Sequence, residues 1–214
     1  MNKRNPHRGA TRRDPTRNRE RILAAALEEF ARYGLGGARV DRIAARAGAN
    51  KRMLYYYFGN KEDLFLAVLE SRYAHIRRAE QGLRLGALAP AEGIRRLVAF
   101  TWNYYLKHPE FLTLLNSENL HRARHLRRSR HIAAMHSPLV AMLRDLLERG
   151  VRQGRFRRGV DPVQLYISIA ALGYFYLSNR HTLSTIFERD LLSRRSKAER
   201  LKHMTGLVLG YLSK

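Results

Sequence analysis

The sequence contains no cysteine, no long apolar run and few acidic residues. Without cysteine the chain can have no disulfide, iron–sulfur cluster or thiolate zinc site, which fits a reducing compartment. No apolar run approaches the roughly 18 residues that a membrane span requires. The N-terminus, MNKRNPHRGATRRDPTRNRE, also lacks the apolar segment of a signal peptide. We therefore expect a soluble, cytoplasmic protein with no membrane association.

Acidic residues are scarce relative to basic ones, with 18 Asp and Glu against 41 Lys and Arg, which gives a net charge of +23. This charge favours a polyanionic partner, and nucleic acid ahead of a membrane surface. An Arg-rich composition without special function is the alternative explanation for the C-terminal share of the excess. Apolar residues make up 45% of the chain, so most of it is expected to fold.

Apolar periodicity predicts an all-α fold of about nine helices, because no stretch alternates with period 2. Residues 1–17 carry many basic residues and no such periodicity, so we expect a flexible basic arm there. This arm is either a disordered tail or a segment that lies along phosphates or in a minor groove. We expect a small first domain at residues 18–63 and a larger helical domain at residues 64–214.

Glycine, asparagine and proline mark the ends of the expected helices. The first helix begins near Asn18 and ends at the glycines that follow residue 33, and a linker is expected at residues 82–90. Asp161 followed by Pro162 is a sharp helix start. The other expected helices cover residues 40–47, 51–58, from 61 onward, 111–119, 132–153, 162–178 and 197–212, with one more between Pro90 and Pro109.

Two short helices joined by a glycine turn, VDRIAARA-GAN-KRMLYYYF, match the helix-turn-helix pattern. Gly48 tolerates the unusual backbone angles of such a turn, and Ala44 is small enough for the helices to cross closely. The second helix must bury one face and present the other to the major groove of DNA.

A helical wheel at 100° per residue divides the aromatic run of this second helix between two faces. Leu54 and Phe58 face inward, and Tyr57 lies near the boundary. Arg52, Tyr55 and Tyr56 lie on the opposite side, with Lys51 in the first turn. The stretch is thus both a core anchor and a candidate DNA-binding surface.

Three segments, ILAAALEEFARYG, RIAARAGANKRMLYYYF and GNKEDLF, together resemble the TetR family of bacterial transcriptional regulators. The resemblance covers residues Arg19 to Leu69. It implies a three-helix DNA-binding domain over residues 18–63 and a helical ligand-binding and dimerisation domain over residues 64–214.

The resemblance also implies DNA contacts at particular positions. Arg52 is the best candidate for specificity, since arginine can bind guanine through two hydrogen bonds. Lys61 would hold a phosphate at the start of a helix, and Lys51 would reach bases or nearby phosphates. The three tyrosines of the second helix would contact bases or the DNA backbone. A hydroxyl that often caps the second helix in this family is replaced here by Ala38 and Arg39, which makes Arg39 a further candidate phosphate contact. The full set is Arg39, Lys51, Arg52, Tyr55, Tyr56, Tyr57 and Lys61; the alternative for each is packing or simple solvation.

For the larger domain, the resemblance implies a small-molecule effector. YFYLSNRHTLS and PEFLTLLNSENLHRARHL loosely resemble a branch that includes a regulator of aromatic carboxylate breakdown. The candidate pocket residues are mostly apolar or amphipathic, as in small-molecule sites: Trp102, Tyr105, Phe111, Asn119, Met135, Tyr174 and Asn179. The alternative is that the aromatic ones simply fill the core. Arg122, Arg124 or His125 would suit an anionic ligand.

Metal binding and catalysis are not indicated by the sequence. His121 and His125 are spaced i, i+4 and would supply half a metal site, but no third ligand lies nearby and a surface pair is favoured. No nucleophile–base set or phosphate loop is present, so we expect neither an enzyme nor a cofactor.

Apolar faces on the last two expected helices point to a homodimer. A two-fold dimer predicts a palindromic operator, because each recognition helix requires its own half-site. The leading hypothesis is a ligand-responsive repressor. The alternative is an architectural or non-specific DNA-binding protein that uses the positive charge.

Overall fold

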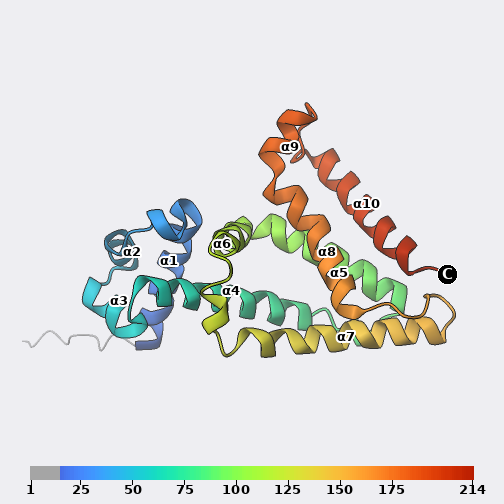
Figure 1. Cartoon of the computed structure of the whole chain (residues 1–214), viewed down its shortest axis with the longest axis horizontal. Helices are drawn as coiled ribbons and strands as arrows, with labels where there is room; N and C mark the ends of the chain where they lie inside the picture. Colours follow the sequence, from blue (N-terminus) through green and yellow to red (C-terminus); the bar gives the residue numbers. More distant parts are fainter. Residues whose placement is uncertain (1–14) are drawn as a thin grey trace, which may run out of the picture. The chain divides into compact units, whose positions relative to one another are not determined.

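The computed structural model describes residues 15–214, and in this range the protein is all-α (Figure 1). Ten α-helices and two 3-10 turns cover these residues, without a β-strand. The predicted all-α class is confirmed, and the expected number of about nine helices is close to the ten found here. None of these helices is both long and apolar enough to cross a membrane.

The expected basic arm lies mainly outside the described residues. Its last three residues, however, belong to the first helix, α1, which runs from Pro15 to Gly37. Proline fits the first turn of a helix, because its fixed φ suits the helix and its missing N–H would have no helical partner there. The helix therefore begins three residues before the expected start at Asn18.

The first unit of the fold consists of α1, α2 (Val40–Ala47), α3 (Lys51–Phe58) and the start of α4 (Lys61–Gln81). It ends at Val68, five residues beyond the expected boundary after residue 63. The reason is packing, since the Phe65 ring of α4 meets the Phe30 ring of α1 edge-on at 5.1 Å. α1 departs from helical geometry at Gly34, close to its expected end.

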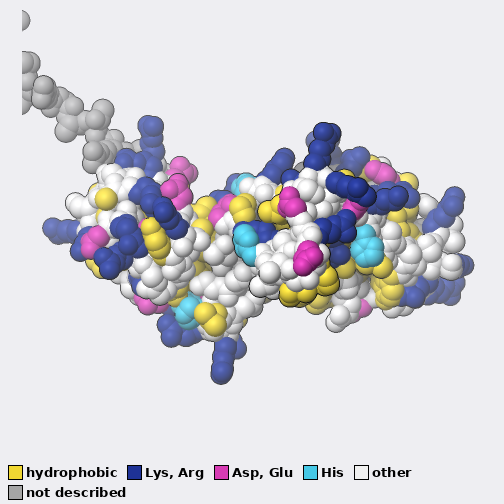
Figure 2. Space-filling model, turned by 90° about the horizontal axis from the view of Figure 1, so that it is seen from above, with side chains coloured by type: hydrophobic (Ala, Val, Ile, Leu, Met, Phe, Trp, Pro, Cys, Tyr) yellow, Lys and Arg dark blue, Asp and Glu magenta, His cyan; other side chains and the backbone are white. Residues whose placement is uncertain are grey.

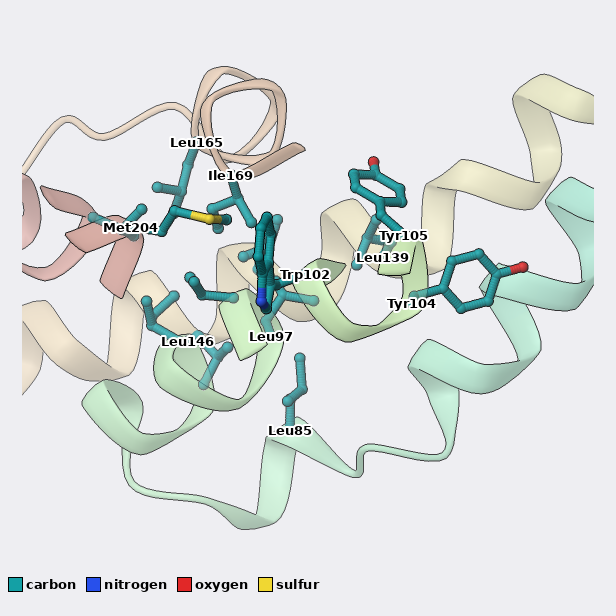
Figure 3. Close-up of a cluster of buried hydrophobic side chains, with 14 of the residues drawn as sticks. Leu85, Leu97, Trp102, Tyr104, Tyr105, Leu139, Leu146, Leu165, Ile169 and Met204 are labelled. Atoms are coloured by element: carbon teal, nitrogen blue, oxygen red, sulfur yellow. The ribbon is translucent and has the colours of Figure 1, made fainter. Parts of the chain in front are cut away.

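The second unit runs from Leu69 to Lys214. After α4, its elements are η1 (Leu85–Ala87), α5 (Pro90–Lys107), α6 (Pro109–Leu120), η2 (Leu126–Arg128), α7 (Ile132–Arg152), α8 (Pro162–Ser178), α9 (Arg180–Ile186) and α10 (Arg194–Leu212). α5 packs against α6, α7, α8 and α10. Its Trp102 is 2% exposed and lies at the centre of the apolar cluster in Figure 3.

Local caps explain why several boundaries match the sequence prediction. The Asp161 carboxylate accepts hydrogen bonds from the backbone amides of Val163 at 2.6 Å and Gln164 at 3.0 Å, and so caps α8. The Ser193 hydroxyl caps α10 in the same way, and that helix begins at Arg194, three residues before its expected start at residue 197. The seven-residue α9 was not expected because it contributes no buried residue, and so it has no apolar stripe to detect.

Candidate nucleic-acid interface

The turn between α2 and α3 depends on Gly48. This residue adopts the left-handed conformation (φ 57°, ψ 37°), and its amide donates to the carbonyl of Ala45 at 3.1 Å. The Arg21 side chain of α1 bonds the carbonyl of Ala47, and a Cβ at Gly48 would overlap the Arg21 guanidinium. Glycine therefore meets two demands here, the backbone conformation and the close approach of α1.

Glu29 of α1 holds the start of α2, which has no side-chain cap of its own, through the amide of Arg39. It is fully buried, and its Oε1 accepts the Arg39 amide at 3.0 Å and the Arg42 Nε at 2.6 Å. The Arg46 guanidinium lies 3.5 Å from the other oxygen. The Glu29 carboxylate of α1 therefore holds both the N-terminus of α2 and two arginine side chains of α2, Arg42 and Arg46.

The environment of Glu29 also sets its protonation. Burial alone would raise its pKa, but the Arg39 amide and the Arg42 and Arg46 guanidinium groups outweigh burial and hold the pKa below its usual value. A carboxylate with a lowered folded-state pKa contributes stability that is complete above its unfolded-state pKa. That contribution is lost as the pH falls through the folded-state value.

Replacing Glu29 with glutamine is therefore expected to destabilise the first unit by about 1–3 kcal/mol at neutral pH, because a charge-assisted hydrogen-bond acceptor is lost. The variant should also lose less stability than the wild type below about pH 4.5. Hydrogen exchange of the α2 amides measures both effects, with second-unit amides as internal reference. Glu28→Gln, at an adjacent side chain that is 67% exposed, is the control. Equal α2 exchange in the Glu29 and Glu28 variants would contradict the capping role.

α3 is anchored at its N-terminus and along one face. The Asn50 Oδ1 accepts the Met53 amide at 2.9 Å and caps the helix. Leu54 is 2% exposed and Phe58 is 8% exposed. The Arg19 guanidinium of α1 lies over the Phe58 ring at 5.2 Å from its centre. The recognition-type helix is thus held rigidly by its inner face and its cap.

The outer face of α3 is exposed as the helical wheel indicated. Tyr56 is 82% exposed and Tyr55 is 49% exposed, and Lys51 and Arg52 are also exposed. Tyr57 is half-buried, with its ring edge-on to that of Tyr56 at 5.3 Å. Two cations and two aromatic hydroxyls therefore share one solvent-facing surface, which we call the α3 face.

Lys51 and the two remaining candidates, Lys61 and Arg39, lie beside the start of α2. The Lys51 ammonium forms an ion pair with Asp41 in the first turn of α2. The Lys61 Nζ donates to the carbonyl of Ala38 at 3.4 Å, next to the exposed Arg39. Lys51, Lys61 and Arg39 thus place three cations around the N-terminus of α2.

Basic side chains also occur away from this face. On the side of the protein drawn in Figure 2, Lys and Arg are scattered over the surface of both units rather than gathered into one patch. Arg122 and Arg124, proposed from the sequence for an anionic ligand, are exposed. The charge excess is therefore a general property of the surface as well as of the candidate interface.

The candidate pocket residues of the second unit occupy different environments. Trp102, Tyr105 and Phe111 are buried in the main core cluster. Of the other four, Met135, Tyr174 and Asn179 are half-buried, and Asn119 is exposed. The Tyr174 hydroxyl bonds the side chain of Asn116, one turn before Asn119, so Asn116 is the α6 amide that meets α8.

The surface pair expected for His121 and His125 is wrong, because only His121 is partly exposed. His125 is fully buried, and its Nδ1 lies 2.6 Å from the Glu118 carboxylate. His121 bonds the carbonyl of Ser117 through its own Nδ1 at 2.7 Å. Within residues 15–214, no group of three or more potential ligands is placed to hold a metal ion.

Four buried charged residues, Glu29, Arg77, Glu80 and Glu118, were not singled out from the sequence. Glu29 lies on the apolar face of α1, four residues after the buried Ala25. Arg77 and Glu80 lie on α4 next to the buried Ile76, and they are 5% and 1% exposed. For Glu29, Arg77 and Glu80, the available signal was a charged residue beside buried apolar residues of the same helix.

The chain matches known proteins over nearly its whole length. A family described as bacterial regulatory proteins, tetR family, matches residues 22–68, and the tetracyclin repressor-like C-terminal domain matches residues 90–208. The HTH-type transcriptional repressor NicS of Pseudomonas putida is 43% identical over 201 residues, which cover 94% of this chain and 95% of NicS. The HTH-type transcriptional repressor SCO4008 of Streptomyces coelicolor is 39% identical over 147 residues, 65% of this chain and 69% of that protein.

The fold comparison agrees with these matches. The crystal structure of SCO4942 from Streptomyces coelicolor superposes with a TM-score of 0.68 at 27% identity, covering 91% of this chain and 98% of that one. One chain therefore matches both the N-terminal and the C-terminal domain families. The protein belongs to the TetR family of bacterial transcriptional regulators.

Proposed function

We propose that this regulator is a ligand-responsive repressor that binds a palindromic operator as a homodimer, with the α3 face in the major groove. The observation that carries the proposal is the division of α3. Leu54 and Phe58 lock the helix to the first unit, whereas Arg52 and Tyr56 project from it. A rigid helix with cations and hydroxyls on one open face suits base recognition.

The α3 face supplies two kinds of contact. Arg52 is the residue proposed to recognise guanine, because its planar donors match the two acceptors on the major-groove edge. Tyr55 and Tyr56 supply hydroxyls and flat apolar surface for bases or backbone. Lys61 and Arg39 are proposed to hold phosphates and so to fix the position of the helix on the duplex.

The dimer is proposed to form through α8 and α10. Five large apolar side chains on these helices are between 44% and 58% exposed: Val163, Ile167, Phe175, Leu207 and Tyr211. Phe175, Leu207 and Tyr211 also line a hollow between the two helices. Burying such a surface against a second copy is favourable in proportion to its apolar area.

Two glycines on α10 support the same assignment. A Cβ added at Gly206 or Gly210 would meet no atom within 4 Å. Glycine inside a helix costs about 0.5–1 kcal/mol relative to alanine, so two of them on an open face are unfavourable in an isolated chain. A partner helix that approaches this face closely accounts for both.

The second unit is proposed to bind the effector. An effector changes operator affinity only if it binds the DNA-competent and incompetent states of the dimer with different affinities. The aromatic and polar groups between α4, α5, α7 and α8 are the proposed location.

The alternative, an architectural DNA-binding protein, is favoured only by the scattered positive charge. Fluorescence anisotropy with the gene's own upstream duplex and a shuffled duplex of equal length separates the two functions. We expect the upstream duplex to bind at least about 10³-fold more tightly at physiological salt. Equal affinity for both duplexes, with the same steep salt dependence, would contradict a site-specific repressor.

A further inference from the structure

A hollow of about 500 Å³ lies between the last turns of α7, the loop 153–161 and the start of α8. Its volume is within the range of small-molecule sites. Its lining residues belong neither to the α3 face nor to the hollow between α8 and α10. The proposed DNA and dimer contacts therefore leave this part of the second unit without a role.

Arginine is the main polar component of the lining. Four arginines line the hollow, two from α7 and two from the loop: Arg144, Arg152, Arg157 and Arg158. Glu148 is the one acidic residue that the described part of the chain contributes to the lining. Its carboxylate lies 4.0 Å from the Arg152 guanidinium, and both side chains are 60% or more exposed, so this ion pair is weak. Four arginines against one glutamate leave three positive charges around one opening.

Stabilisation of the end of α7 accounts for only part of this charge. Basic side chains in the last turn of a helix interact favourably with its C-terminal carbonyls, and α7 carries Arg149 and Arg152 there. Arg144 lies two turns before Arg152, and Arg157 and Arg158 lie beyond the helix. These three arginines therefore require another explanation.

The loop that carries Arg157 and Arg158 is fixed on both sides. Phe156 is 2% exposed, and its ring lies so close to Gly150 of α7 that a Cβ there would overlap it. The Arg157 amide donates to the carbonyl of Leu212 in α10 at 2.8 Å, and the Arg157 guanidinium lies over the Tyr211 ring, 3.6 Å from its centre. A ligand would therefore meet cations on an ordered backbone, which lowers the entropic cost of binding.

Apolar side chains complete the lining. Leu147 is buried, and Val151 and Val160 are half-buried. Hydrogen bonds from guanidinium groups to an anion are stronger beside such surface, because the local dielectric constant is lower than in water. The same surface offers contact area to the uncharged part of a ligand.

We propose that this hollow, which we call the arginine hollow, binds a small molecule that carries a diphosphate or longer phosphate chain. A guanidinium matches a phosphate through two parallel hydrogen bonds. Each phosphate group carries about −1.5 to −2 at neutral pH, so two linked phosphates balance the three positive charges, whereas one carboxylate leaves most of them unbalanced. The site goes beyond the proposed repressor function and does not depend on it.

Free pyrophosphate and nucleoside diphosphates share this chemistry, and they differ in whether an uncharged body contacts the apolar side chains. Isothermal titration of the full chain with pyrophosphate, orthophosphate, ADP and adenosine, without metal ions and at physiological salt, separates them. We expect pyrophosphate and ADP to bind, orthophosphate to bind at least about tenfold more weakly, and adenosine not to bind. ADP that binds about tenfold or more tightly than pyrophosphate identifies a nucleotide site, and equal affinity identifies a site for the phosphate chain alone. No binding of either compound would overturn the proposal.

Two substitutions remove one cation from each wall of the arginine hollow. Arg144→Gln on α7 and Arg158→Gln on the loop should each weaken pyrophosphate binding by about 10–100-fold, as expected for loss of a charge-assisted hydrogen bond. Arg155→Gln is the matched control, because Arg155 is an exposed arginine of the same loop that does not line the hollow. It should weaken binding by less than about twofold. Equal losses in all three variants would indicate general attraction to a basic surface and would overturn the site.

Thermal unfolding verifies that each variant is folded, and all three arginines are exposed, so normal folding is expected. Duplex DNA is the competing polyanion. Saturation of the protein with the gene's own upstream duplex should leave pyrophosphate affinity unchanged, because the hollow lies outside the proposed DNA interface. Displacement of pyrophosphate by the duplex would assign the hollow to nucleic acid and contradict a small-molecule site. Specific duplex binding without any pyrophosphate binding leaves the repressor function standing, so the two proposals fail separately.

Discussion

Arg52→Ala is expected to weaken operator binding by about 10–100-fold for each half-site, because a two-pronged arginine–guanine contact contributes about 1–3 kcal/mol of discrimination. Arg52 is exposed on the α3 face and does not contribute to the buried core, so the variant should fold normally. Fluorescence anisotropy against the specific duplex measures the loss.

The control for this variant is Arg144→Ala, which removes the same charge from an exposed position on α7. It should lower affinity for specific and shuffled DNA equally and only slightly, as a change in general charge does. Arg52→Lys distinguishes charge from geometry, since lysine retains the cation but not the planar pair of donors. If Arg52→Ala behaves like Arg144→Ala, Arg52 does not recognise a base.

Leu207→Arg is expected to convert the dimer into monomers and to lower operator affinity by about 10²–10⁴-fold. Leu207 is 48% exposed on α10 beside the open Gly206, so a charge there would be buried without a partner in the proposed interface. The loss of affinity is large because a dimer bound at one half-site holds its second DNA-binding unit at high effective concentration near the other half-site. A monomer binds each half-site separately.

Leu120→Arg is the comparison for this substitution. Leu120 is 82% exposed at the end of α6, outside the proposed interface, and its replacement should change neither assembly nor DNA binding. Sedimentation velocity gives the oligomeric state of each variant. A Leu207→Arg protein that remains dimeric would exclude the α8–α10 surface as the contact.

Local signals in the sequence were sufficient to predict the helix-turn-helix. Asn50 and Gly48 act through their own backbone neighbours, so the limits of α2 and α3 follow from a few adjacent residues. The division of α3 into Leu54 and Phe58 on one side and Tyr56 on the other follows from helical periodicity alone. These features needed no knowledge of the tertiary structure.

Features that depend on distant partners could not be predicted in this way. The Glu29 side chain caps a helix that starts eleven residues later, at Val40, and the cap requires the crossing of α1 and α2. Arg77 meets Tyr166 across a sequence separation of 89 residues. The sequence shows a charge on an apolar stripe but not its partner, because tertiary packing selects the partner.

The most direct test of the central claim, that the α3 face recognises the operator, is a base-substitution profile. Wild-type protein and Arg52→Ala are titrated against operator variants that each carry one changed base pair. We predict that changes at one symmetric pair of positions cost the wild type about 1–3 kcal/mol and cost Arg52→Ala almost nothing, with other positions unaffected by the variant. Identical profiles for the two proteins at every position would contradict base recognition by Arg52.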